Sequence, residues 1–221
     1  MSLQPMVISG KMIAALSRAV RNSSEERRFS HSVVRCLADP FFPIAFFLRN
    51  VMALRREVHF NRLAPRMQRR LLLRILRERS AIFLEVREWI SKREDGLGFL
   101  TAGNEKPLPG GPDDYCSRCG WCCEIASGMP VFPEDSAVPL KWKNIFGDGL
   151  GKGHRFCAFL WESREAGGSL CSIHPWRSIP CRTFERDECE FLQGEPDFSD
   201  PSVEDRLLET GRWLIGLMDG R

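Results

Sequence analysis

The stretch from Pro65 to Glu94 reads PRMQRRLLLRILRERSAIFLEVREWISKRE, and its apolar residues recur at steps of three and four. The recurring positions are Leu72, Ile75, Leu76, Phe83, Val86 and Ile90. This spacing places them on one face of an α-helix, because an α-helix turns once every 3.6 residues. The sequence therefore predicts a long helix over residues 65–94 that buries one face in a core.

Shorter amphipathic segments precede this stretch. Residues 10–22 place Met12, Ile13, Leu16 and Val20 on one face. Residues 23–38 carry Phe29, Val33 and Leu37 at helical spacing, after a serine cap near Glu25 and Glu26. After the break DPFFP at 39–43, a further stripe comprises Ile44, Phe47, Leu48, Val51, Leu54 and Val58. Each segment is predicted to be a helix, the last one starting at Pro43, a favourable first-turn residue.

Residues 95–114 hold five glycines and three prolines, which favour turns over regular structure. We place a linker here, between a basic helical domain at residues 1–94 and a second domain at 115–221. The second domain shows no sustained period until a final amphipathic helix, which begins near Ser202 or Val203. That helix carries Leu207, Leu208, Leu214, Ile215 and Met218. The predicted fold class is mainly α, with an N-terminal helical region followed by an irregular cysteine-rich domain and a C-terminal helix.

The two halves carry opposite charge. Residues 1–111 contain 20 Lys and Arg against 10 Asp and Glu, whereas residues 112–221 contain 12 against 19. On the long helix, Arg66, Arg70, Arg74 and Arg77 form a basic row. A solvated helix face is the simplest interpretation of this row. A nucleic acid, an acidic partner or the acidic half of the same chain could also face it, but no base-reading module is apparent.

No membrane span or secretory signal is expected from the sequence. The longest apolar run, Phe41 to Leu48, contains a proline and is far shorter than the roughly 20 residues that cross a bilayer. The first 20 residues lack a basic start, a long apolar block and a small-residue cleavage site. We therefore expect a cytoplasmic protein, in which nine cysteines indicate metal or redox use rather than structural disulfides.

Four of the nine cysteines fall in DYCSRCGWCCEI, residues 114–125, and Cys36 lies apart from all others. Two residues between Cys116 and Cys119 allow a turn to direct both sulfurs at one ion, and Cys122 continues the spacing. Cys122 and Cys123 are neighbours whose side chains would diverge in an extended stretch, so they are not expected to serve the same ion. One cluster with spare thiols and two separate sites both remain open. The remaining candidate ligands are Cys157, Cys171, Cys181 and Cys189.

The first three cysteine positions match the start of a bacterial ferredoxin run, but Ala126 stands where the fourth cysteine of such a run is expected. The segments CSRCGWCCEI, CAFLW and CSIHPWRSIPCRTF together resemble the CxxCxxCC cysteine-cluster family, also called YkgJ-like. That family is described as putatively zinc- or iron-chelating. The resemblance covers residues 113–190 and implies that Cys116, Cys119, Cys122, Cys123, Cys157, Cys171 and Cys181 are metal ligands.

The same resemblance marks Arg177 and Arg182 as cofactor-binding residues, because they match the family's RP..CR segment. Ser178 stands where relatives have proline, and His174 stands where they have an aromatic residue, which favours packing over ligation for His174. Four thiolates around Zn2+ or an oxidised four-iron cluster leave about two excess negative charges. Arginines close to the cysteines could compensate for that charge.

The sequence thus predicts a metal-binding cysteine-cluster protein. An iron-sulfur cluster, most simply 4Fe-4S, would serve electron transfer or redox work with a protein partner. The alternative is a zinc-stabilised, non-catalytic module that recognises a protein or nucleic acid. All-thiolate sites suit both metals, and the number of thiols, their adjacent pair and the ferredoxin-like spacing favour iron. A nucleophilic cysteine is disfavoured, because no thioredoxin-like strand-to-helix pattern surrounds the Cys-x-x-Cys pairs.

Overall fold

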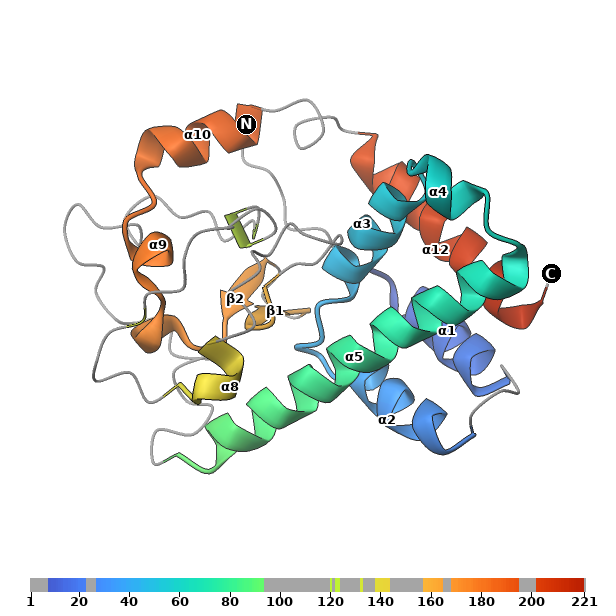
Figure 1. The fold of residues 1–221 in the computed structure, drawn as a ribbon, viewed down its shortest axis with the longest axis horizontal. Coiled ribbons are helices and arrows are strands. Elements are labelled where there is room, and N and C mark those ends of the chain that lie inside the picture. The colour runs from blue at the N-terminus through green and yellow to red at the C-terminus, as the bar shows by residue number, and fades with distance from the viewer. Residues whose placement is uncertain are drawn as a thin grey trace.

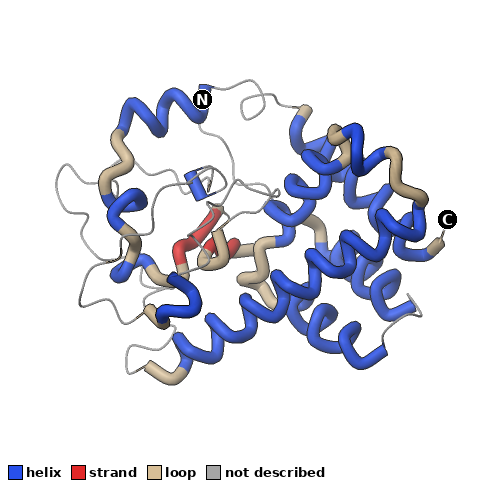
Figure 2. Tube along the Cα trace, viewed as in Figure 1, coloured by secondary structure: helices blue, strands red, loops and turns tan. Residues whose placement is uncertain are grey.

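The computed structural model describes residues 8–22, 27–93, 120, 122–123, 132, 138–143, 157–164, 168–194 and 202–220. Within these residues the chain is mainly helical, as the periodicity predicts (Figures 1 and 2). The N-terminal elements are α1 (Gly10–Asn22), α2 (Arg27–Ala38), α3 (Ile44–Leu54), α4 (Val58–Asn61) and α5 (Pro65–Ser91). Both Glu94, the predicted end of the long helix, and the predicted serine cap at 23–24 lie outside the described residues.

Helix α5 crosses the whole described structure (Figure 1). Its predicted apolar stripe is buried at Leu72, Leu76, Phe83, Val86 and Ile90, while Ile75 is half-buried. The first part of α5 packs against α2 and α12. Its last turns reach the cysteine-rich half, where Trp89 packs edge-on against Trp142 with ring centroids 5.3 Å apart. The long helix therefore connects the two halves of the chain.

The stripe that starts at Ile44 does not continue to Val58, as the sequence analysis expected. Helix α3 ends at Leu54, and Val58 begins the separate helix α4, where it is 58% exposed. The break at residues 55–57 lets Phe60 enter the core instead, where it packs against Trp213 with ring centroids 6.3 Å apart. Burying an aromatic ring removes more apolar surface from water than burying a valine does.

The final helix, α12 (Val203–Asp219), begins where the sequence predicts and returns to the N-terminal helices (Figure 1). It packs mainly against α1 and α3, burying Leu207, Leu214 and Met218. An added Cβ at Gly211 would lie 2.4 Å from the sulfur of Met12, so the two helices approach closely at this point. The division of the chain into two domains stays a prediction, and the described core contains residues from both halves.

The cysteine-rich half contains short elements that the sequence analysis treated as irregular. Strands β1 (Leu160–Glu162) and β2 (Ser169–Cys171) pair antiparallel, with Leu160 opposite Cys171 (Figure 2). Around this hairpin lie α8 (Leu140–Lys143), the 3-10 helix η3 (His174–Trp176), α9 (Ile179–Arg182) and α10 (Arg186–Gly194). Apart from the nine-residue α10, these elements have three or four residues, which is too short to show a hydrophobic period.

Tryptophan rings fill the space between the hairpin and the helices. Trp161 on β1 is fully buried, with its ring centroid 5.1 Å from that of Phe83 and 6.0 Å from that of Phe41. Trp142 is buried on α8, and Trp176 is half-buried on η3. Trp121 lies outside the described residues. These three tryptophans therefore pack as part of the core.

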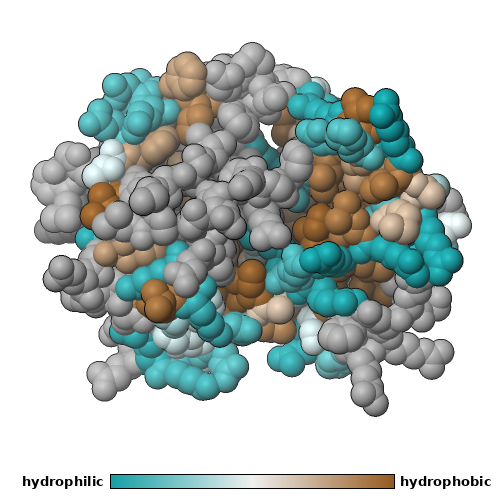
Figure 3. Space-filling view, in the orientation of Figure 1, coloured by the Kyte–Doolittle hydropathy of each residue, from teal (hydrophilic) through white to brown (hydrophobic). Residues whose placement is uncertain are grey.

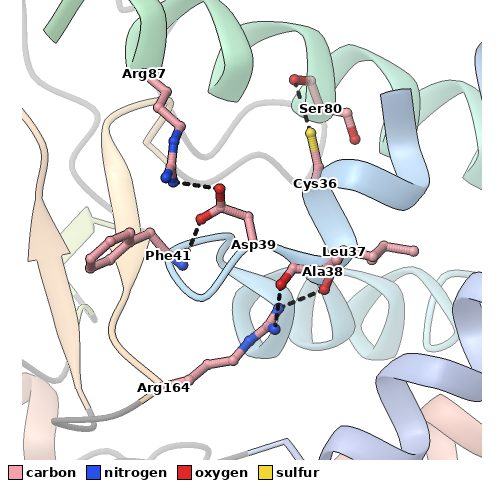
Figure 4. Close-up of polar contacts among 8 residues, drawn as sticks. All are labelled: Cys36, Leu37, Ala38, Asp39, Phe41, Ser80, Arg87 and Arg164. Atoms are coloured by element: carbon pink, nitrogen blue, oxygen red, sulfur yellow. Dashed lines mark hydrogen bonds and ion pairs between the residues drawn. The ribbon is translucent and has the colours of Figure 1, made fainter. Parts of the chain in front are cut away.

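The turn between α2 and α3 is held by polar contacts from two other parts of the chain (Figure 4). Arg87 of α5 forms an ion pair with Asp39, whose other oxygen accepts a hydrogen bond from the N–H of Phe41 at 3.0 Å. Arg164, just beyond β1, donates to the carbonyls of Leu37 at 2.8 Å and Ala38 at 3.5 Å. The end of α2 is therefore capped by a side chain from the cysteine-rich half.

Candidate metal centre

The candidate ligands come from separate segments of the chain. Cys122 and Cys123 form a helical turn, Cys157 precedes β1, Cys171 ends β2, and Cys181 and Cys189 lie on α9 and α10. All six are free thiols. Cys116 and Cys119 lie outside the described residues. The structure thus describes six of the eight predicted ligands.

Five of these thiols lie close enough to influence one another's charge. Negative charge on Cys171 and Cys181 helps to raise the pKa of Cys157, and charge on Cys157 and Cys171 does the same for Cys123. Cys122 acts on the pKa of Cys181 in the same way. Such interactions fall off with distance, so the five sulfurs, which come from four chain segments, lie in the same region of the structure. The N–H of Cys157 also donates to the carbonyl of Cys123 at 2.8 Å, which joins two of the segments.

The pKa values of these thiols indicate which of them are protonated. Burial is the largest cause of the raised pKa of Cys157, Cys171 and Cys181, and it brings that of Cys171 to about 12. Cys123 donates its S–H to Cys122, which raises the pKa of Cys123 and lowers that of Cys122 to about 7. The four thiols whose pKa is raised therefore hold their protons at neutral pH. A metal ion would deprotonate any of them that became its ligands.

Hydrogen-bond donors already point at three of the sulfurs. The Cys157 sulfur accepts from the N–H of Phe159 at 3.4 Å, and the Cys171 sulfur accepts from the N–H of Ile173, again two residues further along the chain. The Cys181 sulfur accepts from the hydroxyl of Ser178 at 3.4 Å. Such donors favour the thiolate form of a cysteine and orient it as a ligand.

The turn that carries Cys122 and Cys123 depends on a glycine that the sequence analysis did not single out. Gly120 has φ 78°, a conformation that residues with a side chain adopt at a cost. An added Cβ there would lie 2.3 Å from the ring of Phe46 on α3, and the Gly120 carbonyl accepts from the N–H of Cys123 at 3.0 Å. This glycine lets the cysteine turn pack directly against α3.

Of the two predicted cofactor-binding arginines, Arg177 lies near the thiols. Its positive charge partly offsets the raised pKa of Cys171 and Cys181 and contributes to the lowered pKa of Cys122. Arg182 is exposed on α9, where its Nε donates to the Arg177 carbonyl at 3.0 Å. The structure therefore gives Arg177 the place expected of a charge-compensating residue, and Arg182 supports the backbone of Arg177.

Cys189 and Cys36 differ from the five clustered thiols. Cys189 is half-buried on α10, where its N–H donates to the carbonyl of Glu185, and its role as a ligand stays a prediction. Cys36 is fully buried on α2 and its sulfur donates to the Ser80 carbonyl at 3.5 Å (Figure 4). Burial raises its pKa to about 11. It is a small residue of the core.

A metal fits this cluster by its donor chemistry. Five buried or half-buried cysteines, backbone donors and a nearby guanidinium are groups expected around a thiolate-bound metal. Among the residues that the structure describes, no group of three Cys, His, Asp or Glu side chains is arranged so that it could hold a metal ion. Two of the predicted ligands, Cys116 and Cys119, fall outside those residues.

The basic row lies on α5 as predicted. Arg66, Arg70 and Arg74 are exposed and Arg77 is half-buried, with Arg74 bonded to Glu78 at 3.0 Å. Two ion pairs join the halves: Arg55 with Glu209 of α12 at 3.5 Å, and Lys141 of α8 with Glu85 of α5 at 2.6 Å. The positive residue belongs to the N-terminal half in the first pair and to the C-terminal half in the second. These two pairs therefore do not follow the simple docking of a basic half on an acidic half.

The described residues contain no helix that is long and apolar enough to cross a membrane. Family models, curated proteins and solved structures were compared with this chain, and none matches it. The likeness to the cysteine-cluster family therefore rests on the motifs between Cys116 and Arg182 alone.

Proposed function

We propose that this chain is a metal-binding cysteine-cluster protein that holds an iron-sulfur cluster for electron transfer with a protein partner. The observation that carries the proposal is the proximity of five buried or half-buried thiols from four segments of the chain. Thiols with raised pKa values stay protonated in the metal-free chain, and a bound metal replaces those protons and stabilises the thiolates.

The ligands would be drawn from Cys122, Cys123, Cys157, Cys171 and Cys181, together with Cys116 and Cys119. An iron-sulfur cluster bound by them would supply one-electron transfer. The chain's own part is to exclude water and to hold the sulfurs with the donors of Phe159, Ile173 and Ser178. The Arg177 guanidinium would offset the excess negative charge of the thiolates.

A zinc-stabilised binding module is the second candidate, because the same thiols and backbone donors suit Zn2+. In such a module the ion would contribute on the order of 10 kcal/mol to folding and perform no chemistry. The two candidates differ in colour. Protein with iron and sulfide absorbs visible light through thiolate-to-iron charge transfer, whereas the zinc form is colourless and releases zinc when its thiols are modified.

The test is metal analysis and an absorption spectrum of the full chain purified without oxygen, for the natural sequence, Cys157→Ser and Cys36→Ser. Both cysteines are buried free thiols, but only Cys157 belongs to the cluster. We expect Cys157→Ser to lose at least half of its bound metal and Cys36→Ser to keep all of it. Equal metal content in the three proteins, or no metal in any of them, would refute the proposal.

A further inference from the structure

The segment from Arg56 to Arg70, here named the α4–α5 corner, exposes large apolar side chains. Val58 is 58% exposed, Leu63 36% and Met67 48%. These are three of the six large apolar side chains that are exposed among the described residues, and they fall within ten positions. A group of exposed apolar side chains in one place indicates an interaction surface, whereas scattered ones do not.

The same corner is strongly basic. Arg56, Arg62, Arg66 and Arg70 are exposed, and Glu57 is the one acidic residue of the segment. In the space-filling view, apolar atoms project among hydrophilic ones over α4 and the start of α5 (Figure 3). A partner for this surface must therefore combine negative charge with a region that accepts apolar side chains.

The inner side of the corner is firmly attached. Phe60 is buried against Trp213, and Arg55 stacks on the same indole with its guanidinium carbon 4.7 Å from the ring centroid. The Asn61 amide donates to the Arg55 carbonyl at 2.7 Å, and the Gln68 amide donates to the Phe60 carbonyl at 3.1 Å. The outward side chains are thus presented by an ordered turn that is packed on α12.

We propose that the α4–α5 corner binds the surface of an anionic lipid bilayer. Aliphatic and thioether side chains enter the boundary between headgroups and acyl chains without needing a shaped pocket, while the arginines contact the lipid phosphates. Proteins that bind single-stranded nucleic acid stack bases on exposed aromatic rings, but the one phenylalanine, tyrosine or tryptophan of this corner, Phe60, is buried. Bilayer chemistry therefore fits both the charge and the apolar content of the corner.

The experiment measures co-sedimentation of the full chain with phospholipid vesicles. One set is phosphatidylcholine alone, and the other contains about 30 mol% phosphatidylserine. We expect at least tenfold tighter binding to the anionic vesicles, weakening as salt is added. Equal binding to both sets, or none to either, would overturn the proposal.

Three variants test whether vesicle binding depends on the α4–α5 corner or only on the net charge of the protein. The triple change Arg62→Gln, Arg66→Gln and Arg70→Gln is expected to weaken anionic vesicle binding about a hundredfold, since each surface cation contributes about fivefold. Val58→Ser, Leu63→Ser and Met67→Ser together should weaken it at least tenfold. The control is Lys11→Gln, Arg18→Gln and Arg21→Gln on α1, which removes equal charge from exposed positions elsewhere. Circular dichroism confirms that each variant keeps its helices.

An equal loss of vesicle binding in the α1 control would show that the corner has no special role and would overturn the proposal. Competition with a single-stranded oligonucleotide and with poly-glutamate tests the other partners. If either polymer binds more tightly than the vesicles, and does so equally well to the serine variant, the corner serves a nucleic acid or an acidic protein instead.

Discussion

At the scale of single residues, Gly120 shows why a short cysteine motif needs more than cysteines. Its φ of 78° and the 2.3 Å approach of the Phe46 ring to an added Cβ leave room for no other residue without movement. Phe46 is nearly buried in the core, so it has little freedom to move away. The position of the thiol turn on α3 therefore depends on this glycine.

We expect Gly120→Ala to lower the free energy of unfolding by about 2 kcal/mol, because it adds backbone strain at positive φ and a steric overlap. Gly216→Ala is the matched control, since no atom lies within 4 Å of an added Cβ in the middle of α12. That change should stabilise the protein by about 0.5–1 kcal/mol. Urea unfolding followed by circular dichroism gives both values. Unchanged stability of Gly120→Ala would contradict the close packing of the turn on α3.

At this scale the sequence predicts which side chains are candidate metal ligands, but it cannot predict which groups surround them. The spacing of the cysteines points to a shared site, and Cys36 is correctly separated from them. The hydroxyl of Ser178 and the N–H groups of Phe159 and Ile173 act on the sulfurs only after the local turns form. The glycine after Cys119 is a visible signal, but its close contact with Phe46 depends on tertiary packing.

At the scale of elements, the β1–β2 hairpin joins the thiols to the ends of two helices. Glu162 on β1 accepts a hydrogen bond from the N–H of Phe46 at 3.0 Å, in the first turn of α3. Arg164 caps the end of α2. Arg164 carries a positive charge, which matches the partial negative charge at the C-terminal end of α2. Because Cys157 precedes β1 and Cys171 ends β2, any displacement of the thiols reaches both helices.

Glu162 also makes the free energy of unfolding depend on pH. Burial raises the pKa of its carboxyl from the ordinary 4.5 to about 8, although hydrogen bonds from the α3 backbone act in the opposite direction. The folded chain therefore holds this proton more tightly than the unfolded chain does. The stability that this bound proton contributes is fully present below about pH 4.5 and is lost as the pH rises to about 8.

Replacing Glu162 with glutamine keeps a carbonyl acceptor and removes the titration. We expect the natural protein to lose on the order of a few kcal/mol of unfolding free energy between about pH 5 and pH 8 that the variant does not lose. Urea unfolding across this range measures the difference, with the exposed Glu190→Gln as control. Parallel pH profiles for the natural protein and Glu162→Gln would rule out a raised pKa at this position.

At the scale of the whole molecule, α12 completes the core formed by the N-terminal helices. The helix lies at the other end of the sequence from α1, yet the two pack together, and α12 also packs against α3. The apolar face of α12 includes the buried Leu207, Leu214 and Met218. Residues 115–221 alone would expose that face to water, at a cost of about 1.5–3 kcal/mol for each large side chain.

A fragment of residues 95–221 is therefore expected to aggregate or to lose the helicity of α12. Circular dichroism and size-exclusion chromatography of the fragment test this expectation, with the full chain as reference. Adding separately expressed residues 1–94 should restore helicity and a monodisperse complex, since α1 and α3 supply the missing surface. A monomeric, helical fragment would show instead that the predicted boundary at 95–114 separates two independent domains.

The sequence predicts the long helices and their buried faces because helical periodicity is a local property. Helix α1 has the predicted bounds, and α5 and α12 begin where the pattern places them. The wrong extension of the third stripe to Val58 has a tertiary cause, because Trp213 on α12 provides the site that Phe60 fills. Similarly, the packing of α12 on α1 and the hairpin's contacts with α2 and α3 join distant segments, which no local pattern reveals.

The position of α12 after all the cysteines in the sequence has a consequence for biosynthesis. A ribosome releases the thiol-bearing segments before it releases the helix that completes the packing of α1 and α3. During synthesis the thiol-bearing segments are therefore available to a metal donor or to an oxidant before α1 and α3 acquire their full packing. Under the proposed function, metal loading need not wait for α12.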